Sequence, residues 1–265
     1  MHETHYREEA YPIIRIRPYR YSDTEEIHEL FRTSMTSGDG SPRRAAMRAR
    51  WSSPLSYALY ATTALGFLSY AWFPSIYSRY IGLALSIFGL STICIRLYSL
   101  HCAFIKFRQN ALTGDLGNIA DRYGMVPEPQ TEKQNGHDSD YLVSKSKNCF
   151  WVAEAVGELE GGKPEVVGYV GIDVNANSDE TSAELRRLVV SPKCRRRGIA
   201  GQLIKVSIAH ARLHNIKSIY LTTSAYHTSA IDLYRKFGWV LQRQYVLLRS
   251  IDVVEMNLDL SASIL

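Results

Sequence analysis

The residues best suited to chemistry in this 265-residue chain form a basic turn around one glycine, Arg195-Arg196-Arg197-Gly198-Ile199-Ala200. An apolar, β-branched run from Glu184 to Val190 precedes the turn, and an amphipathic run from Ile199 to His214 follows it. This pattern predicts a strand, a turn and a helix. Free N–H groups at a helix N-terminus bind phosphate, glycine lets the backbone come close, and arginine supplies charge. The expected ligand is a pyrophosphate.

Two familiar phosphate-binding patterns do not fit this turn. It lacks the Gly-Lys-Ser/Thr ending of a Walker loop and the Gly-x-Gly-x-x-Gly of a dinucleotide site. The plainer alternative is a solvated basic turn, or a nuclear-import tract, at Lys193–Arg197. We expect no metal, because the four cysteines show no ligand spacing and because His210 and His214 lack a third ligand.

At these residues the sequence resembles the GNAT superfamily of acetyl-CoA-dependent N-acetyltransferases. Its signature, Arg/Gln-x-x-Gly-x-Gly/Ala, is matched by Arg195, Gly198 and Ala200. The resemblance implies acetyl-CoA as co-substrate. It also implies a cofactor-binding set that comprises the turn and the end of the preceding strand: Leu188, Val189, Val190, Arg195, Arg196, Arg197, Gly198, Ile199, Ala200 and Gly201.

Acetyl transfer from a thioester to an amine needs a base for the ammonium and a proton for the departing thiolate. Glu184, at the start of the strand, is the candidate base, acting directly or through water. The alternative is a glutamate paired with Arg186. Tyr234 stands where the family's Leu-Tyr-x-x-x-Gly-Phe tyrosine stands, and in many members that phenol protonates the thiolate. The alternative is a packed aromatic ring with a satisfied hydroxyl.

His227 departs from the family pattern. The family often has Asn three residues before the alanine of this helix, here Ala230, in contact with the CoA arm. Histidine there could donate a hydrogen bond to CoA, cap the helix or take part in proton transfer, and we favour the first two roles.

The remaining elements follow the order of a GNAT domain. We expect a strand over Ile13–Arg17, helices over Thr24–Thr33 and Leu112–Tyr123, and an antiparallel pair, Phe150–Ala155 and Glu165–Val174, joined through Gly161-Gly162. After the basic turn and its helix we expect a strand over Ser218–Thr223, a helix over Thr228–Phe237 and a closing hairpin. The predicted fold is therefore α+β, a mixed and mostly antiparallel sheet flanked by helices.

An apolar insert separates the first two helices. It has an uncharged run from Trp51 to Tyr77, then Arg79, then a second run from Tyr80 to Ile95 that continues to Phe107. About twenty apolar residues cross a bilayer. Since both parts of the fold must lie on one side, we expect a membrane hairpin, with its basic flanks and the catalytic domain in the cytosol. The alternative is a hydrophobic helical pair in a soluble core.

These expectations divide the chain. Residues 1–11 form a flexible N-terminus, 12–38 the first strand and helix, 39–108 the basic-flanked membrane insert, 109–260 the rest of the acetyltransferase domain and 261–265 a tail. Lipid would contact residues 51–107. The net charge is +5, and the arginines cluster around the insert and the glycine turn. This distribution favours lipid headgroups and phosphate over nucleic acid as partners.

The insert, Glu-Leu-x-Arg-Leu in the central strand and Thr-Ser-x-x-His before the tyrosine helix look like the camello or N-acetyltransferase-8-like membrane-bound group. That group acetylates aspartate, cysteine S-conjugates and protein lysines, and it implies the endoplasmic reticulum. Arg187 aligns with an arginine of the aspartate branch, and its fork would suit an acceptor carboxylate; the alternative is a solvent-facing strand residue. We expect an N-acetyltransferase for an amino-acid-like amine. Acetylation of protein lysines and a non-catalytic acetyl-CoA-binding membrane protein stay open.

Overall fold

The computed structural model describes residues 13–36, 41–127, 142–144, 146–157, 164–176 and 181–261. The expected flexible N-terminus at 1–11, the turn through Gly161-Gly162 and most of the C-terminal tail lie outside these residues.

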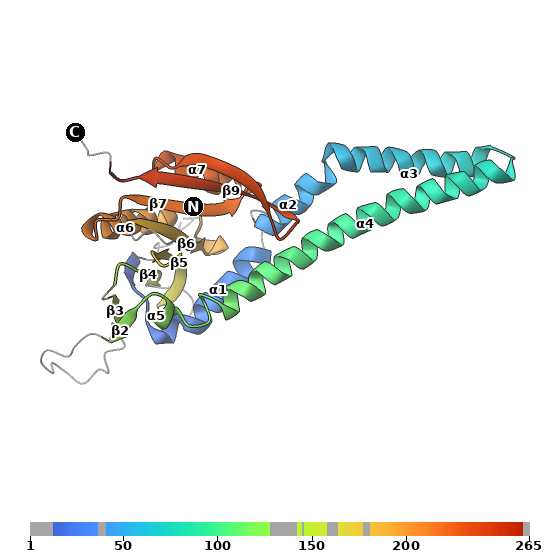
Figure 1. Cartoon of the computed structure of the whole chain (residues 1–265). Helices are drawn as coiled ribbons and strands as arrows, with labels where there is room; N and C mark the ends of the chain where they lie inside the picture. The colour runs from blue at the N-terminus through green and yellow to red at the C-terminus, as the bar shows by residue number, and fades with distance from the viewer. Residues whose placement is uncertain are drawn as a thin grey trace, which may run out of the picture.

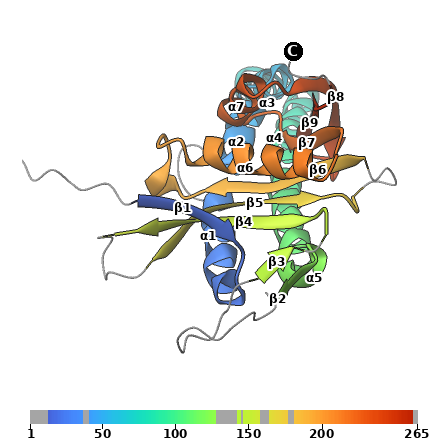
Figure 2. The same cartoon turned by 90° about the vertical axis from the view of Figure 1, so that its left-hand side faces the viewer.

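Seven of the described strands form one twisted sheet (Figure 2). Every neighbouring pair is antiparallel except β6 and β7, which are parallel. The predicted mixed, mostly antiparallel sheet is therefore confirmed. In spatial order the strands are β1 (Ile13–Pro18), β4 (Cys149–Val156), β5 (Glu165–Asp173), β6 (Ser182–Val190), β7 (Ser218–Ser224), β9 (Ile251–Asp259) and β8 (Val240–Leu247).

Helices cover this sheet and bury its apolar side chains. They include α1 (Thr24–Thr36), α6 (Ile199–Leu213) and α7 (Thr228–Lys236), each close to its predicted position. The core under them contains Phe31 from α1, Leu203 from α6 and Phe150 from β4, all essentially inaccessible to solvent. A small second sheet, which the sequence did not predict, pairs β2 (Met125–Pro127) with β3 (Leu142–Ser144).

The apolar insert projects from the body as a helical arm (Figure 1). A short basic helix, α2 (Pro42–Trp51), leads into α3 (Pro54–Trp72), which runs back along α4 (Ile76–Thr113). Glycines let these two backbones touch, because a Cβ on Gly66 would lie 2.6 Å from the carbonyl oxygen of Gly82, and one on Gly82 would lie 2.5 Å from that of Gly66.

Large apolar side chains cover the outside of this arm. Trp72 is 83% exposed and Tyr77 78%, and many leucine, isoleucine and phenylalanine side chains of α3 and α4 are also exposed. A pair of helices buried in a soluble core would hide these surfaces, so that alternative is wrong. Among the described helices, α4 is the one whose length and composition suffice to cross a membrane, and only 11% of its most apolar window is buried within the protein.

The separate helix predicted over Leu112–Tyr123 is much shorter in the structure. The helix that leaves the arm, α4, continues unbroken into the body that carries the sheet and ends at Thr113, where Gly114 follows as its C-cap. The next helix, α5 (Ile119–Arg122), is one short turn capped by the Asn118 side chain. Two glycines, Gly114 and Gly117, interrupt the expected helix. The arm and the body share one continuous helix, α4.

Candidate active site

The cavity of the candidate site lies where two neighbouring strands of the sheet, β6 and β7, separate. Strands β6 and β7 pair only from Ser182 to Glu184, opposite Ser218 to Tyr220, and then diverge. A cavity of about 1150 Å³ fills the opening, lined by the free edge of β6 on one side and by Thr222, Thr223 and Ser224 of β7 on the other. Because the two strands no longer pair there, backbone N–H and C=O groups of β6 are left for a ligand.

The basic turn lies at one end of this cavity, where α6 begins. Gly198 takes φ +77°, a conformation that other residues rarely adopt, and a Cβ there would meet nothing within 4 Å. In the described structure, the N–H groups of Ile199, Ala200 and Gly201 have no hydrogen-bond partner, so they remain available to an anion. Arg195 and Arg196 also line the cavity.

One strand irregularity shapes the wall that β6 forms. Gly171 pairs with Arg186 and Tyr169 with Val189, so two residues of β6, Arg187 and Leu188, face one residue of β5. Arg187 takes φ +57° in this bulge. A bulge turns the following backbone and re-aims its N–H groups. Leu188 in this bulge and the next two residues, Val189 and Val190, line the cavity.

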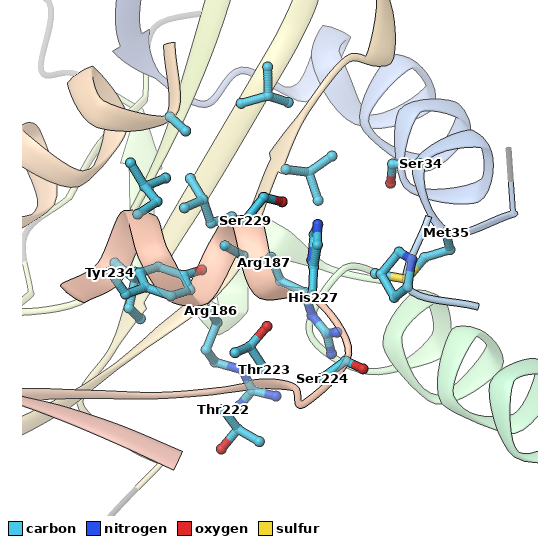
Figure 3. Close-up of a pocket in the computed structure, with 18 of the residues that line it drawn as sticks. Ser34, Met35, Arg186, Arg187, Thr222, Thr223, Ser224, His227, Ser229 and Tyr234 are labelled. Atoms are coloured by element: carbon cyan, nitrogen blue, oxygen red, sulfur yellow. The ribbon is translucent and has the colours of Figure 1, made fainter. Parts of the chain in front are cut away.

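Tyr234 enters the cavity from α7, and its hydroxyl points toward the other labelled side chains (Figure 3). The ring packs against Trp239, with 5.8 Å between the ring centroids. Its hydroxyl makes no hydrogen bond to any residue that the structure describes, so it is not a satisfied structural hydroxyl. Burial raises the pKa of Tyr234 far above its usual value, so the phenol keeps its proton at neutral pH.

Glu184 lies where β6 and β7 separate. Burial raises the pKa of its carboxyl above the usual 4.5, which the positive charge of Arg186 opposes and the negative charge of Asp173 supports. Arg186 is only a partial counterion, since its Nη1 lies 3.5 Å from Glu184 Oε2 but 3.3 Å from Asp173 Oδ2. Asp173 is fully buried and is also bound by Arg122. Glu184 therefore has the features of both alternatives. It lines the cavity with a raised pKa, as a base would, and it also forms an ion pair with Arg186.

Arg187 lines the cavity but its guanidinium is already engaged. Its Nε and Nη2 bind the two carboxylate oxygens of Asp115 at 2.8 and 2.7 Å. The rings of Phe31 and Phe107 lie on the guanidinium, each with its centroid 5.6 Å from Cζ. It is therefore not the solvent-facing strand residue that was the alternative. An acceptor carboxylate would have to use Nη1 or displace Asp115.

His227 and Arg197 differ in their relation to the cavity. His227 occupies the N-cap position of α7, yet its side chain makes no capping hydrogen bond, so the expected capping role is wrong. It lines the cavity instead, and burial and the charge of Arg195 lower the pKa of its imidazole, which is neutral at pH 7. Arg197 is exposed and does not line the cavity.

Sequence reasoning missed the residues that complete this site from afar in the chain. Asp115 and Asp173 carry no motif, and their importance arises only because the fold sets them against Arg186 and Arg187. The wall away from the basic turn is apolar and comes from α1, α4 and the β8–β9 hairpin: Phe31, Met35, Phe104, Phe107, Leu247, Ile251 and Val253.

Known proteins share this part of the chain. The acetyltransferase (GNAT) family matches residues 115–239. An Escherichia coli (strain K12) protein, the "uncharacterized N-acetyltransferase YjgM", is 30% identical over 129 residues, which are 48% of this chain and 70% of that protein. The chain therefore belongs to the GNAT acetyltransferase family, and is by membership an acyltransferase.

Within the family, the chain is similar to members of the expected N-acetyltransferase-8-like group. N-acetylaspartate synthetase of Danio rerio is 33% identical over 99 residues, and human N-acetyltransferase 8 is 31% identical over 97 residues. Each match covers 37% of this chain, but only 32% and 40% of those relatives. A solved GNAT acetyltransferase from Staphylococcus aureus Mu50 covers 92% of this chain and 99% of its own, at a TM-score of 0.46 and 15% identity.

Proposed function

We propose that the protein is a membrane-anchored N-acetyltransferase that moves the acetyl group of acetyl-CoA to the amino group of an amino-acid-like acceptor. One observation carries this proposal. The split between β6 and β7 brings an anion-binding helix N-terminus, a proton-holding phenol and a carboxylate of raised pKa to one cavity.

Acetyl-CoA fits the features of that cavity. Its pyrophosphate would be held by the N–H groups of Ile199, Ala200 and Gly201, with charge from Arg195 and Arg196. The free edge of β6 after the Arg187 bulge offers backbone groups for the pantetheine arm and for the thioester carbonyl. The neutral imidazole of His227 can donate to the same arm.

The chemistry then needs three proton transfers. Glu184, directly or through water, takes a proton from the acceptor ammonium, and the amine nitrogen attacks the acetyl carbon. Backbone N–H groups of β6 stabilise the oxyanion that forms. As the carbon–sulfur bond breaks, the Tyr234 phenol gives its proton to the departing thiolate, and the nitrogen gives its second proton to the Tyr234 phenolate. The products are the N-acetylated acceptor and free CoA.

The membrane part of the proposal is supported by the exposed apolar arm. Transfer of α3 and α4 from water into lipid would bury their large exposed side chains. A hairpin of two crossings keeps both ends on one side, as the shared sheet requires, and the basic residues of α2 and of the end of α4 favour the cytosol for that side. The endoplasmic reticulum is the membrane that we infer from the resemblance to the camello or N-acetyltransferase-8-like group.

The acceptor is tested by a panel of amines. Full-length protein in nanodiscs would be incubated with acetyl-CoA and with aspartate, S-benzyl cysteine or a lysine peptide, and the acetylated product identified by mass spectrometry. We expect one of the two amino-acid acceptors to be acetylated. Acetylation of the peptide alone would instead make the protein a lysine acetyltransferase, and binding of acetyl-CoA without any product would leave a non-catalytic binding protein.

A further inference from the structure

The root of the arm, where α2, α3, α4 and the β8–β9 turn meet, is a cluster of arginines and aromatic rings. The arm root is defined here by Arg48, Arg50, Trp51, Tyr57, Tyr60, Arg96 and Arg249. Hydrogen bonds bring these elements together, since Arg50 donates to the Ser250 carbonyl at 2.7 Å and Arg96 donates to Ser53 Oγ at 3.3 Å. The helical arm leaves the body at this point (Figure 1).

The positive charge of the arm root has little internal compensation. From Ser41 to Thr113 the chain contains no aspartate or glutamate. The oxygens that Arg50 and Arg96 bind are neutral, and Nη1 of Arg96 is buried without any hydrogen-bond partner in the described structure. A cation whose hydrogen-bond partners are neutral oxygens still favours an anion, because such partners offset its desolvation only in part. Arg48 and Arg249 add exposed charge beside it.

Aromatic rings mark the same level of the arm. Trp51 stacks on Tyr60 with 6.3 Å between centroids, and Tyr57 meets Tyr60 edge-on at 6.1 Å. Trp51 and Tyr57 are nonetheless about half exposed, at 49% and 59%. Tryptophan and tyrosine prefer the headgroup layer of a bilayer, where one end of the ring is wet and the other is apolar.

The length of the arm places this level at a membrane surface. At 1.5 Å per residue, α4 rises about 30 Å from Ile76 to Arg96, which is close to the thickness of a bilayer's hydrocarbon core. A second set of exposed aromatics, Trp72, Tyr77 and Tyr80, lies at the far end, accompanied by a single arginine, Arg79. With the tip at one interface, the arm root lies at the other.

We propose that the arm root binds the headgroups of anionic phospholipids. This inference rests on the membrane insertion in the proposed function and adds the lipid class. A phosphate or carboxylate oxygen of such a lipid would accept hydrogen bonds from the arginine N–H groups of the arm root. The acyl chains of the lipid would lie along the apolar surface that begins at Leu55. A soluble phosphate has no acyl chain that could contact that apolar surface.

Fluorescence quenching can report which lipid surrounds the root. Full-length protein carrying Trp72→Phe would be placed in phosphatidylcholine nanodiscs that contain the same small fraction of either brominated phosphatidylserine or brominated phosphatidylcholine. Trp51 is then the lipid-exposed tryptophan, because Trp151 and Trp239 are buried in the body. We expect brominated phosphatidylserine to quench at least about threefold more than brominated phosphatidylcholine, and high salt to reduce that ratio.

Variants assign the preference to the arm root. Replacing both Arg48 and Arg249 by glutamine should lower the ratio, whereas Arg79→Gln removes one charge at the tip and should leave it unchanged. Equal quenching by both lipids in the Trp72→Phe protein, or a ratio that the double substitution does not lower, would overturn the lipid site. Absence of quenching by either lipid would instead contradict insertion of the arm, and with it the membrane part of the proposed function.

Discussion

Asp115 and Arg187 form a two-point ion pair that joins the end of α4 to the bulge of β6. Their oxygens and nitrogens lie 2.7 and 2.8 Å apart, and the side chains of Asp115 and Arg187 are 4% and 12% exposed. Phe107, on the same α4 helix, lies against the guanidinium. One helix therefore carries the apolar arm and holds the strand that lines the cavity.

Removing the carboxylate of this pair should destabilise the protein. Asp115→Asn leaves Arg187 with a charge that is nearly buried and uncompensated, so we expect the free energy of unfolding to fall by about 3 kcal/mol. Chemical unfolding in detergent, followed by near-ultraviolet circular dichroism, measures this loss. Glu255→Gln is the matched control, because its partner Arg243 is 67% exposed and such a pair is worth under about 1 kcal/mol. Equal losses in both variants would contradict the structural role of the buried pair.

The Tyr234 hydroxyl should matter to the chemical step and not to binding. Tyr234→Phe keeps the ring against Trp239 and removes the proton donor, so kcat should fall about 10²- to 10⁴-fold while the Kd of acetyl-CoA stays within about twofold. Tyr226→Phe removes a hydroxyl that already binds Asp252 and should have a much smaller effect on kcat. An unchanged kcat in Tyr234→Phe would exclude the phenol as the thiolate's acid.

The arginines of the glycine turn should contribute unequally to acetyl-CoA affinity. Arg195 lines the cavity and Arg197 does not, although the two are close neighbours in the chain. A hydrogen bond to a charged group is worth about 1.5–3 kcal/mol, so Arg195→Gln should raise the Kd of acetyl-CoA about tenfold or more. Arg197→Gln should change it much less, as calorimetric titration can show. The reverse order would place the pyrophosphate elsewhere.

The acidic limb of the pH profile should follow Glu184. Because burial raises its pKa above 4.5, kcat/KM should rise with pH through a value above 4.5 as the carboxyl loses its proton. The negative charge of Asp173 helps to raise that pKa, so Asp173→Asn should move the limb to lower pH. One acceptor is used throughout, so that its own titration is common to both profiles. A limb that stays in place, or moves to higher pH, would contradict Glu184 as the base.

Much of this site could be predicted from the sequence because it lies in local patterns. The glycine turn before α6, the tyrosine on α7 and the strand that carries Glu184 are contiguous stretches whose periodicity and turn residues determine their structure. Asp115 could not be predicted, since it follows Gly114 in a turn without a motif and meets Arg187 only through the fold. The predicted start of the helix over Leu112–Tyr123 was wrong for a related reason. Helix propensity alone did not show that α4 continues from the arm to Thr113.

Acetyl transfer at this cavity is tested most simply by the release of free CoA thiol from acetyl-CoA. The full-length protein in nanodiscs would be assayed with the best acceptor of the panel. We expect turnover by the wild type, near-complete loss in Gly198→Glu through lost acetyl-CoA binding, and a loss in Tyr234→Phe with binding kept. A wild-type protein that neither binds acetyl-CoA nor releases thiol would contradict the proposed function.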